Sequence, residues 1–129
     1  MSKKTADNWL ALAEYDLETA RAMLATKRYL YVAFMCQQAI EKTLKACYVL
    51  QHQKTPPYTH NLLRLVAELA FAGDLTGDRR EHVEVLNSYY VESRYTEDME
   101  SLMKTITEEK AKALLASTEE VLRWLKSRM

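Results

Sequence analysis

The stretch YLYVAFMCQQAIEKTLKACYVLQH, from Tyr29 to His52, decides the fold. Apolar residues recur along it at steps of three and four, which is the period of an amphipathic helix. Its main apolar stripe consists of Tyr29, Val32, Ala33, Cys36, Ile40, Leu44, Cys47 and Leu50. Pro56 and Pro57 follow, and they end a helix because proline lacks an N–H donor and fixes φ. The stretch therefore predicts one long helix.

Similar patterns before and after this stretch predict further helices. A helix is expected from Ala6 to Ala25, and a short one from His60 to Phe71 with Thr59 as its N-cap. The first of these helices should bury one stripe, formed by Trp9, Leu12, Ala13, Leu17, Ala20 and Leu24.

The C-terminal third is less regular. A helix is expected from Asp78 to Glu92 or Ser93, and Thr107 followed by two glutamates predicts the start of the last helix. Residues 94–105 fit a loop, a short helix or an early start of the last helix. Five helical stretches with short connections, and only two glycines and two prolines, indicate an all-α up-and-down bundle. The 129 residues suggest one domain, residues 1–129.

The charge and cysteine content limit the possible classes of protein. Lys plus Arg and Asp plus Glu are 18 each, so net charge gives no broad attraction to nucleic acid or membrane. Cys36 and Cys47 are separated by about 16 Å of helix rise and cannot form a disulfide with each other. Free thiols, the absence of a signal peptide and the lack of a membrane-spanning apolar run predict a cytoplasmic protein that does not enter a membrane.

Three stretches together resemble a known family. They are CQQAIEKTLKACYVLQ at 36–51, PPYTHNLLRL at 56–65 and YYVESRYTED at 89–98. In this order and spacing they resemble the HEPN domain, in particular its small stand-alone prokaryotic members. The resemblance implies an antiparallel four-helix bundle with an additional short helix, and a symmetric homodimer. It also implies a minimal nucleotidyltransferase as a partner, in a toxin–antitoxin-like system.

Many HEPN proteins are metal-independent ribonucleases whose signature is an arginine and a following histidine with four to six residues between them. Arg94 matches that arginine in position, but the residues five to seven positions after it are Met99, Glu100 and Ser101. An arginine stabilises phosphate charge but stays protonated, so it cannot transfer protons as an imidazole does. The resemblance therefore favours a binding module over an enzyme.

In the favoured hypothesis Arg94 anchors a phosphate, and Tyr95 or Tyr90 stacks on a base. In the simpler interpretation Arg94 binds carbonyl groups at the end of its helix, or pairs with a nearby acid.

A second group of candidates lies on the long helix. Gln38, Glu41, Lys42 and Lys45 share one side of it and could receive an anion in a polar cleft. The same row also fits a solvated face or a network between helices. The tyrosines at 29, 31, 48 and 58, with Phe34, fit the core or a subunit interface better than a base-stacking surface.

The alternative hypotheses use other residues or none. In a ribonuclease, His60 could replace the missing histidine; otherwise it binds backbone or neighbouring side chains. A purely structural interaction protein is the third possibility. The sequence contains no metal-ligand spacing, phosphate-binding glycine loop or nucleophile motif, so no metal and no cofactor are expected.

Overall fold

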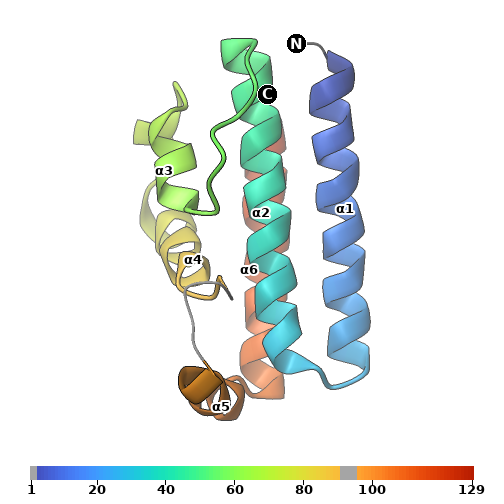
Figure 1. Ribbon diagram of the computed structural model, residues 1–129. Helices are drawn as coiled ribbons and strands as arrows, with labels where there is room; N and C mark the ends of the chain where they lie inside the picture. Colours follow the sequence, from blue (N-terminus) through green and yellow to red (C-terminus); the bar gives the residue numbers. More distant parts are fainter. Residues whose placement is uncertain (1–2, 91–95) are drawn as a thin grey trace.

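The computed structural model describes residues 3–90 and 96–129, apart from the side chains of 96–99 and 102 (Figure 1). All regular structure in these residues is helical, which confirms the predicted all-α class. The elements are α1 (Lys3–Ala25), α2 (Tyr29–His52), α3 (Leu62–Ala67), the 3-10 turn η1 (Ala72–Asp74), α4 (Gly77–Asn87), α5 (Thr96–Thr105) and α6 (Glu108–Ser127).

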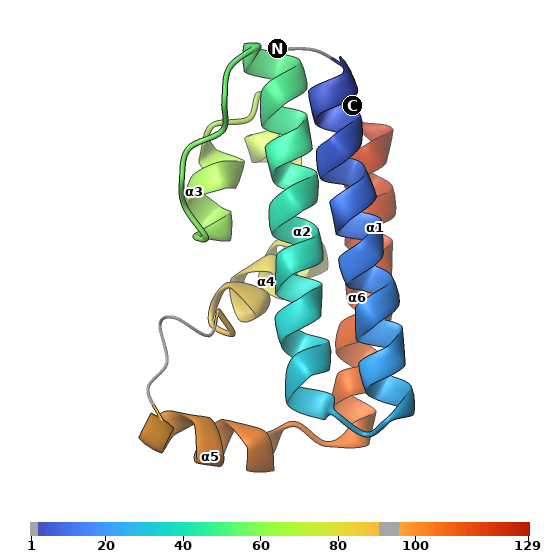
Figure 2. The same cartoon turned by 45° about the vertical axis from the view of Figure 1, so that its right-hand side comes forward.

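The long helices α1, α2 and α6 lie side by side, and α3 and α4 cover the side of α2 away from α1 (Figures 1 and 2). α2 is the central helix, because 14 of its 24 residues are buried. Its apolar side chains join those of α1, α3, α4 and α6 in one hydrophobic cluster. α5 lies across the end of the bundle where α1 turns into α2 (Figure 2).

Several predicted helix ends agree with the structure. α2 runs over the predicted residues and ends at His52. The next residue, Gln53, caps it: its backbone is left-handed (φ 56°), and its N–H bonds to the Val49 carbonyl. The Thr107 hydroxyl accepts from the Lys110 N–H at 3.2 Å, so Thr107 is the N-cap of α6 as predicted.

Other predictions are wrong in detail. Asn61, not Thr59, caps α3: its Oδ1 accepts from two backbone N–H groups of the helix, while the Thr59 hydroxyl accepts from the Asn61 N–H. α3 is therefore shorter than expected. Leu12, expected in the core, is 49% exposed. Residues 96–105 form a separate short helix, which is one of the three possibilities that the sequence left open. In the described residues no helix is both long and apolar enough to cross a membrane.

Candidate functional site

A buried carboxylate, Glu41, lies at the centre of the most polar cluster inside the bundle. Its side chain is only 3% exposed. One carboxylate oxygen lies 3.0 Å from Lys45 Nζ, one helical turn further along α2, and the other lies 2.8 Å from His60 Nδ1. A carboxylate can only accept, so Nδ1 is the donor in the second contact. Both oxygens of the buried acid are thereby satisfied.

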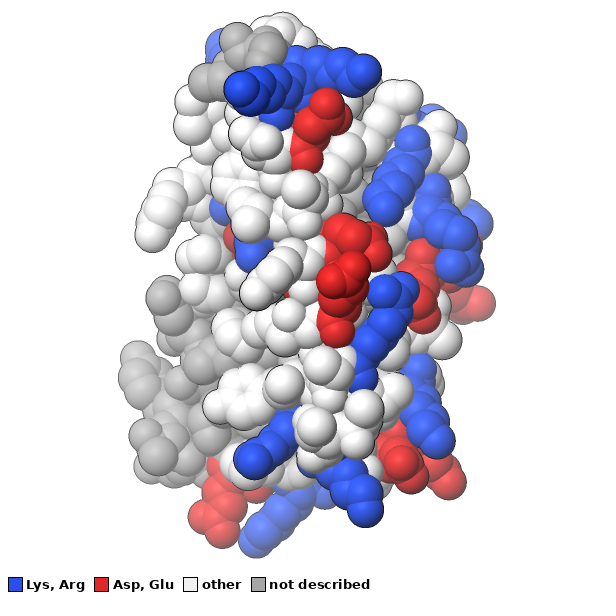
Figure 3. Space-filling view, turned by 90° about the vertical axis from the view of Figure 1, so that its right-hand side faces the viewer, with Lys and Arg blue, Asp and Glu red and all other residues white. Residues whose placement is uncertain are grey.

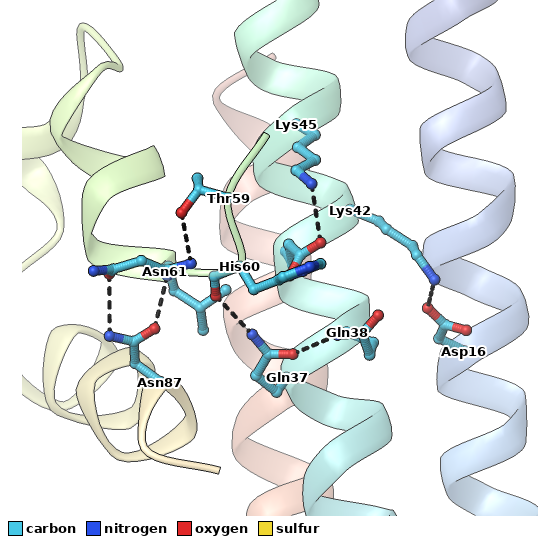
Figure 4. Close-up of polar contacts among 11 residues, drawn as sticks. Asp16, Gln37, Gln38, Lys42, Lys45, Thr59, His60, Asn61 and Asn87 are labelled. Carbon is cyan, nitrogen blue, oxygen red and sulfur yellow. Dashed lines mark hydrogen bonds and ion pairs between the residues drawn. The ribbon is translucent and has the colours of Figure 1, made fainter. Parts of the chain in front are cut away.

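The regular spacing of polar residues on α2 explains how His60 is positioned (Figure 4). Gln37 lies one turn before Glu41, and its amide donates to the His60 carbonyl at 3.0 Å. Gln38 in turn donates to the Gln37 side-chain oxygen at 2.7 Å. α2 thus holds His60 by both its main chain and its ring, although His60 belongs to the segment that follows the two prolines.

Two aromatic residues also contact the His60 ring. The Tyr90 ring stacks on it, with centroids 4.3 Å apart and planes 14° apart, and the Tyr58 ring meets it edge-on at 5.9 Å. A cavity of about 240 Å³ opens beside this stack and is lined by His60, Asn61, Asn87 and Tyr90. The histidine ring therefore forms one wall of a small polar cavity.

Two asparagines fix the far side of this cavity. Asn87, the last residue of α4, accepts from the Leu62 N–H at 2.7 Å and donates to the Asn61 side-chain oxygen at 3.2 Å. These contacts connect α4 to the start of α3. They also bring Tyr90, three residues after Asn87, to its position on the His60 ring.

The two lysines predicted to bind an anion are both engaged by acids. Lys42 forms an ion pair with Asp16 of α1, and Lys45, besides Glu41, lies 5.4 Å from the centre of the Trp9 ring. Glu41 and Lys45 are buried, so the row on α2 is not a solvated face but a network inside the bundle. Its positive charges are balanced by Asp16 and Glu41, and an anion would have to compete with these carboxylates.

The structure thus brings five of the predicted site residues into one network: Gln38 through Gln37, Glu41 and Lys45 by their ion pair, and Tyr90 and His60 by direct stacking. Lys42 lies apart with Asp16. Arg94 and Tyr95 lie outside the described residues, so their predicted roles stay predictions.

The chemical capacity of the cluster follows from its hydrogen bonds. With Nδ1 donated to Glu41, the second ring nitrogen of His60 forms no hydrogen bond to the described residues and is available to a ligand. Among the described residues no group of acids, cysteines and histidines could hold a metal ion. The buried polar side-chain atoms in the same residues all have hydrogen-bond partners.

Three members of the cluster were missed by the sequence reasoning: Gln37, Asn61 and Asn87. Gln37 carried a signal, because it lies four residues before Glu41 and eight before Lys45 on the same side of one helix. Asn61 also carried one, as an asparagine directly before an apolar helical run. Asn87 carried none, since its partner lies 26 residues away in the chain.

Comparison with known proteins gives the family. A family model described as "HEPN domain" matches residues 6–128. The solved structure of TT1696 from Thermus thermophilus is similar over 96% of this chain and 98% of its own, at 26% identity and a TM-score of 0.80. That of ST0689, "an archaeal HEPN homologue", is similar over 95% of this chain and 96% of its own, at 25% identity and a TM-score of 0.70. A search of curated proteins found no significant match. Since the family model covers nearly the whole sequence, the chain belongs to the HEPN domain family.

Proposed function

We propose that this HEPN-domain protein is a homodimer that binds a nucleotide or an RNA segment, with Arg94 as the phosphate anchor and without catalysis of its own. The observation that carries the proposal is the stack of Tyr90 on His60, beside a polar cavity. Tyr90, which lines the cavity, lies only four residues before Arg94 in the chain. An aromatic ring and an arginine close together in the sequence suit a ligand with a base and a phosphate.

The lack of a motif histidine supports a binding role over catalysis. The signature places its histidine at residue 99, 100 or 101, counted from Arg94, and these residues are methionine, glutamate and serine. His60, the histidine nearest to Tyr90 in the structure, has one ring nitrogen bonded to a buried carboxylate and its ring covered by Tyr90. In this proposal its task is to shape the cavity.

One surface supports the homodimer. On the face shown in Figure 3, the charged side chains gather to one side and at the ends, and the side next to the grey residues is largely uncharged. On α1 two large side chains reach solvent, Leu12 at 49% and Tyr15 at 69% exposure. Exposed aliphatic and aromatic side chains of this kind are typical of the centre of a subunit interface.

Light scattering after size-exclusion chromatography tests the dimer. The wild type should elute with the mass of two chains, and Leu12→Glu with Tyr15→Glu should give a monomer that keeps its helical circular dichroism. A monomeric wild type at micromolar concentration would contradict this part of the proposal.

Anisotropy of a labelled single-stranded RNA and calorimetry with ATP test the binding role. Arg94→Ala should weaken binding about 10- to 100-fold, the range expected for a lost charge-assisted phosphate contact. Arg123→Ala on α6 is the matched control, because Arg123 is exposed and forms no ion pair within the described residues. Equal binding by the two variants would remove Arg94 from the site. A wild type that binds neither RNA nor nucleotide would leave the structural interaction protein as the surviving hypothesis.

A second candidate function, a metal-independent ribonuclease, is favoured by the 2.8 Å contact of His60 with Glu41. A buried carboxylate on Nδ1 fixes the ring and its tautomer, which is how many catalytic histidines are oriented for proton transfer. Arg94 would then stabilise the phosphorane. Incubation with RNA in EDTA tests this: His60→Gln should abolish cleavage, while His52→Gln, at a histidine bonded to a backbone carbonyl, should not. Cleavage that persists in His60→Gln would exclude the mechanism.

The proposal also includes a minimal nucleotidyltransferase as protein partner, in a toxin–antitoxin-like pair. What supports it is membership of the HEPN family, together with the resemblance to its small stand-alone members, which implies such a partner. A nucleotidyltransferase gene beside the gene of this protein, and co-purification of the two products, are the expected results. Separate elution of the two co-expressed proteins would contradict the pairing.

A further inference from the structure

The turn between α1 and α2 presents two adjacent cations, Lys27 and Arg28. Both are exposed, and within the part of the chain that the structure describes neither forms an ion pair. By contrast, Arg21, Lys42, Lys45 and Arg79 are all paired with acids. The turn is therefore a place where positive charge is exposed and uncompensated.

The backbone holds this turn in one conformation. The N–H groups of Thr26, Lys27 and Arg28 bond back to carbonyls in the last turn of α1, at 3.1, 3.2 and 2.7 Å. Lys27 has a left-handed backbone, with φ of 63°, which closes the helix and starts the next one. The two cations thus start from a fixed backbone, and a ligand need not order it.

A cavity of about 250 Å³ lies next to these cations. Its lining consists of Lys27, Arg28, Tyr29, Leu30, Tyr31 and Met103. This volume is below the usual 300–1,000 Å³ of a drug-sized ligand site, so it suits one phosphate–sugar unit or one base. Tyr31, assigned from the sequence to the core or a subunit interface, is 49% exposed here, and Met103 of α5 is 60% exposed.

Among the described residues, one acid, Glu108, is known to act on this cavity through its charge. Partial burial raises the pKa of the Tyr29 hydroxyl, and the negative charge of Glu108 raises it further. Glu108 lies 4.0 Å from Lys112 in a surface ion pair, so part of its charge is already balanced. Within the part of the chain that the structure describes, the turn therefore keeps an excess of positive charge.

We propose that Lys27, Arg28 and Tyr31 form a second contact site for single-stranded RNA, with the cations on phosphates and the Tyr31 ring on a base. This inference rests on the proposed function and extends it, because the cavity shares Met103 with α5, the helix that follows residues 91–95 in the chain. Cations interleaved with aromatic rings are typical of surfaces that bind single strands without sequence preference. An acidic protein segment would use the two cations but has no base to stack on the exposed Tyr31 ring, so RNA fits this surface better.

The salt dependence of RNA binding tests the cations. Affinity for a fluorescein-labelled 12-nucleotide RNA is measured by anisotropy from 50 to 300 mM NaCl. Each phosphate contact on a single strand adds about 0.7 to the slope of log affinity against log salt, so Lys27→Ala with Arg28→Ala should lower the slope by about 1.4. The matched control is Lys3→Ala with Lys4→Ala, which removes the same charge from the other end of α1, about 33 Å away.

The aromatic contact is tested separately. Tyr31→Ala should weaken RNA binding about 5- to 150-fold, and Tyr31→Phe should bind like the wild type, because a stacked base needs the ring and not the hydroxyl. Unfolding midpoints of all variants confirm that the fold is kept.

Three results would overturn the inference alone: an unchanged salt slope in the Lys27/Arg28 variant, an equal fall in the Lys3/Lys4 control, or displacement of the RNA by poly-glutamate at equal charge concentration. In each case Arg94→Ala would still weaken binding. A wild type that does not bind RNA at all would overturn the proposed RNA binding and this site together.

Discussion

Two histidines of this protein lie in comparable places between helices but have different partners. His60 donates to the buried Glu41 carboxylate, whereas His82 of α4 lies 2.8 Å from the hydroxyl of the fully buried Thr118 of α6. Burial lowers the pKa of His82 to about 4, although the charge of Glu120 acts in the opposite direction. A proton added to His82 meets only a hydroxyl in a poorly hydrated contact, and this disfavours the charged form of its ring. The His60 region therefore contains a buried ion pair, Glu41 with Lys45, whereas the His82 region disfavours charge on the histidine ring.

The largest expected effect comes from removing the carboxylate that distinguishes the two regions. Glu41→Leu should lower the free energy of unfolding by about 3–5 kcal/mol, because it leaves Lys45 buried without its partner. Thr118→Val, which removes the partner of His82, should cost only about 1–3 kcal/mol, since no charge is left unpaired. Urea unfolding at pH 7.5 measures both.

A double variant separates the lost charge pair from general damage to the core. Glu41→Leu with Lys45→Met replaces both ions by apolar groups and should recover most of the stability. Failure of this recovery, or a Thr118→Val variant less stable than Glu41→Leu, would show that the buried ion pair does not distinguish the two regions.

The second effect concerns pH. Because the pKa of folded His82 is about 4 and that of an unfolded histidine about 6.5, the unfolded chain binds the proton first as the pH falls. The contribution of His82 is therefore fully present above pH 6.5 and is lost toward pH 4. It should reduce stability by about 2 kcal/mol between pH 7.5 and 5. Other groups titrate in this range, so the measured quantity is the difference between wild type and His82→Gln. Parallel pH profiles for the two proteins would contradict this assignment.

Much of the fold could be predicted from the sequence, because the signals that set its helices act between residues close together in the chain. α2 and the start of α6 follow from apolar spacing, two prolines and one threonine cap, all of which act within a few residues. Leu12 was misplaced because periodicity fixes a stripe only to within about one residue, and which edge of it is covered depends on the neighbouring helices. The separate helix α5 could not be chosen among the three possibilities, because no cap or glycine marks its limits in the sequence.

The site was predictable only in part. Gln38, Glu41 and Lys45 could be grouped because they share one helix, but their burial depends on the segment that carries His60, which the sequence does not place. The stack of His60 on Tyr90 joins residues 30 positions apart and left no local signal.

A smaller effect tests how the His60 region is fixed to the rest of the bundle. Asn61→Ala should cost about 1–2 kcal/mol, because it removes an N-cap that accepts from the N–H groups of Leu63 and Arg64 and also accepts from Asn87. Thr107→Ala, which removes a cap with one such contact at α6, should cost about 1 kcal/mol or less. Thermal unfolding compares the two, and a larger loss in Thr107→Ala would mean that the Asn61–Asn87 contact adds nothing.

The smallest expected effect uses an exposed ion pair as the reference for the buried one. Arg21 of α1 lies 2.7 Å from Glu119 of α6, closer than Lys45 lies to Glu41, but these side chains are 45% and 30% exposed. Water already stabilises both charges when they are apart, so Arg21→Ala should cost about 0.2–1 kcal/mol, and the cost should vanish in 1 M NaCl. The cost of Glu41→Leu should change little with salt, because ions do not reach a buried pair. If both costs fell with salt to the same extent, the interior network at Glu41 would be open to solvent, and His60 would have no protected carboxylate to hold its ring.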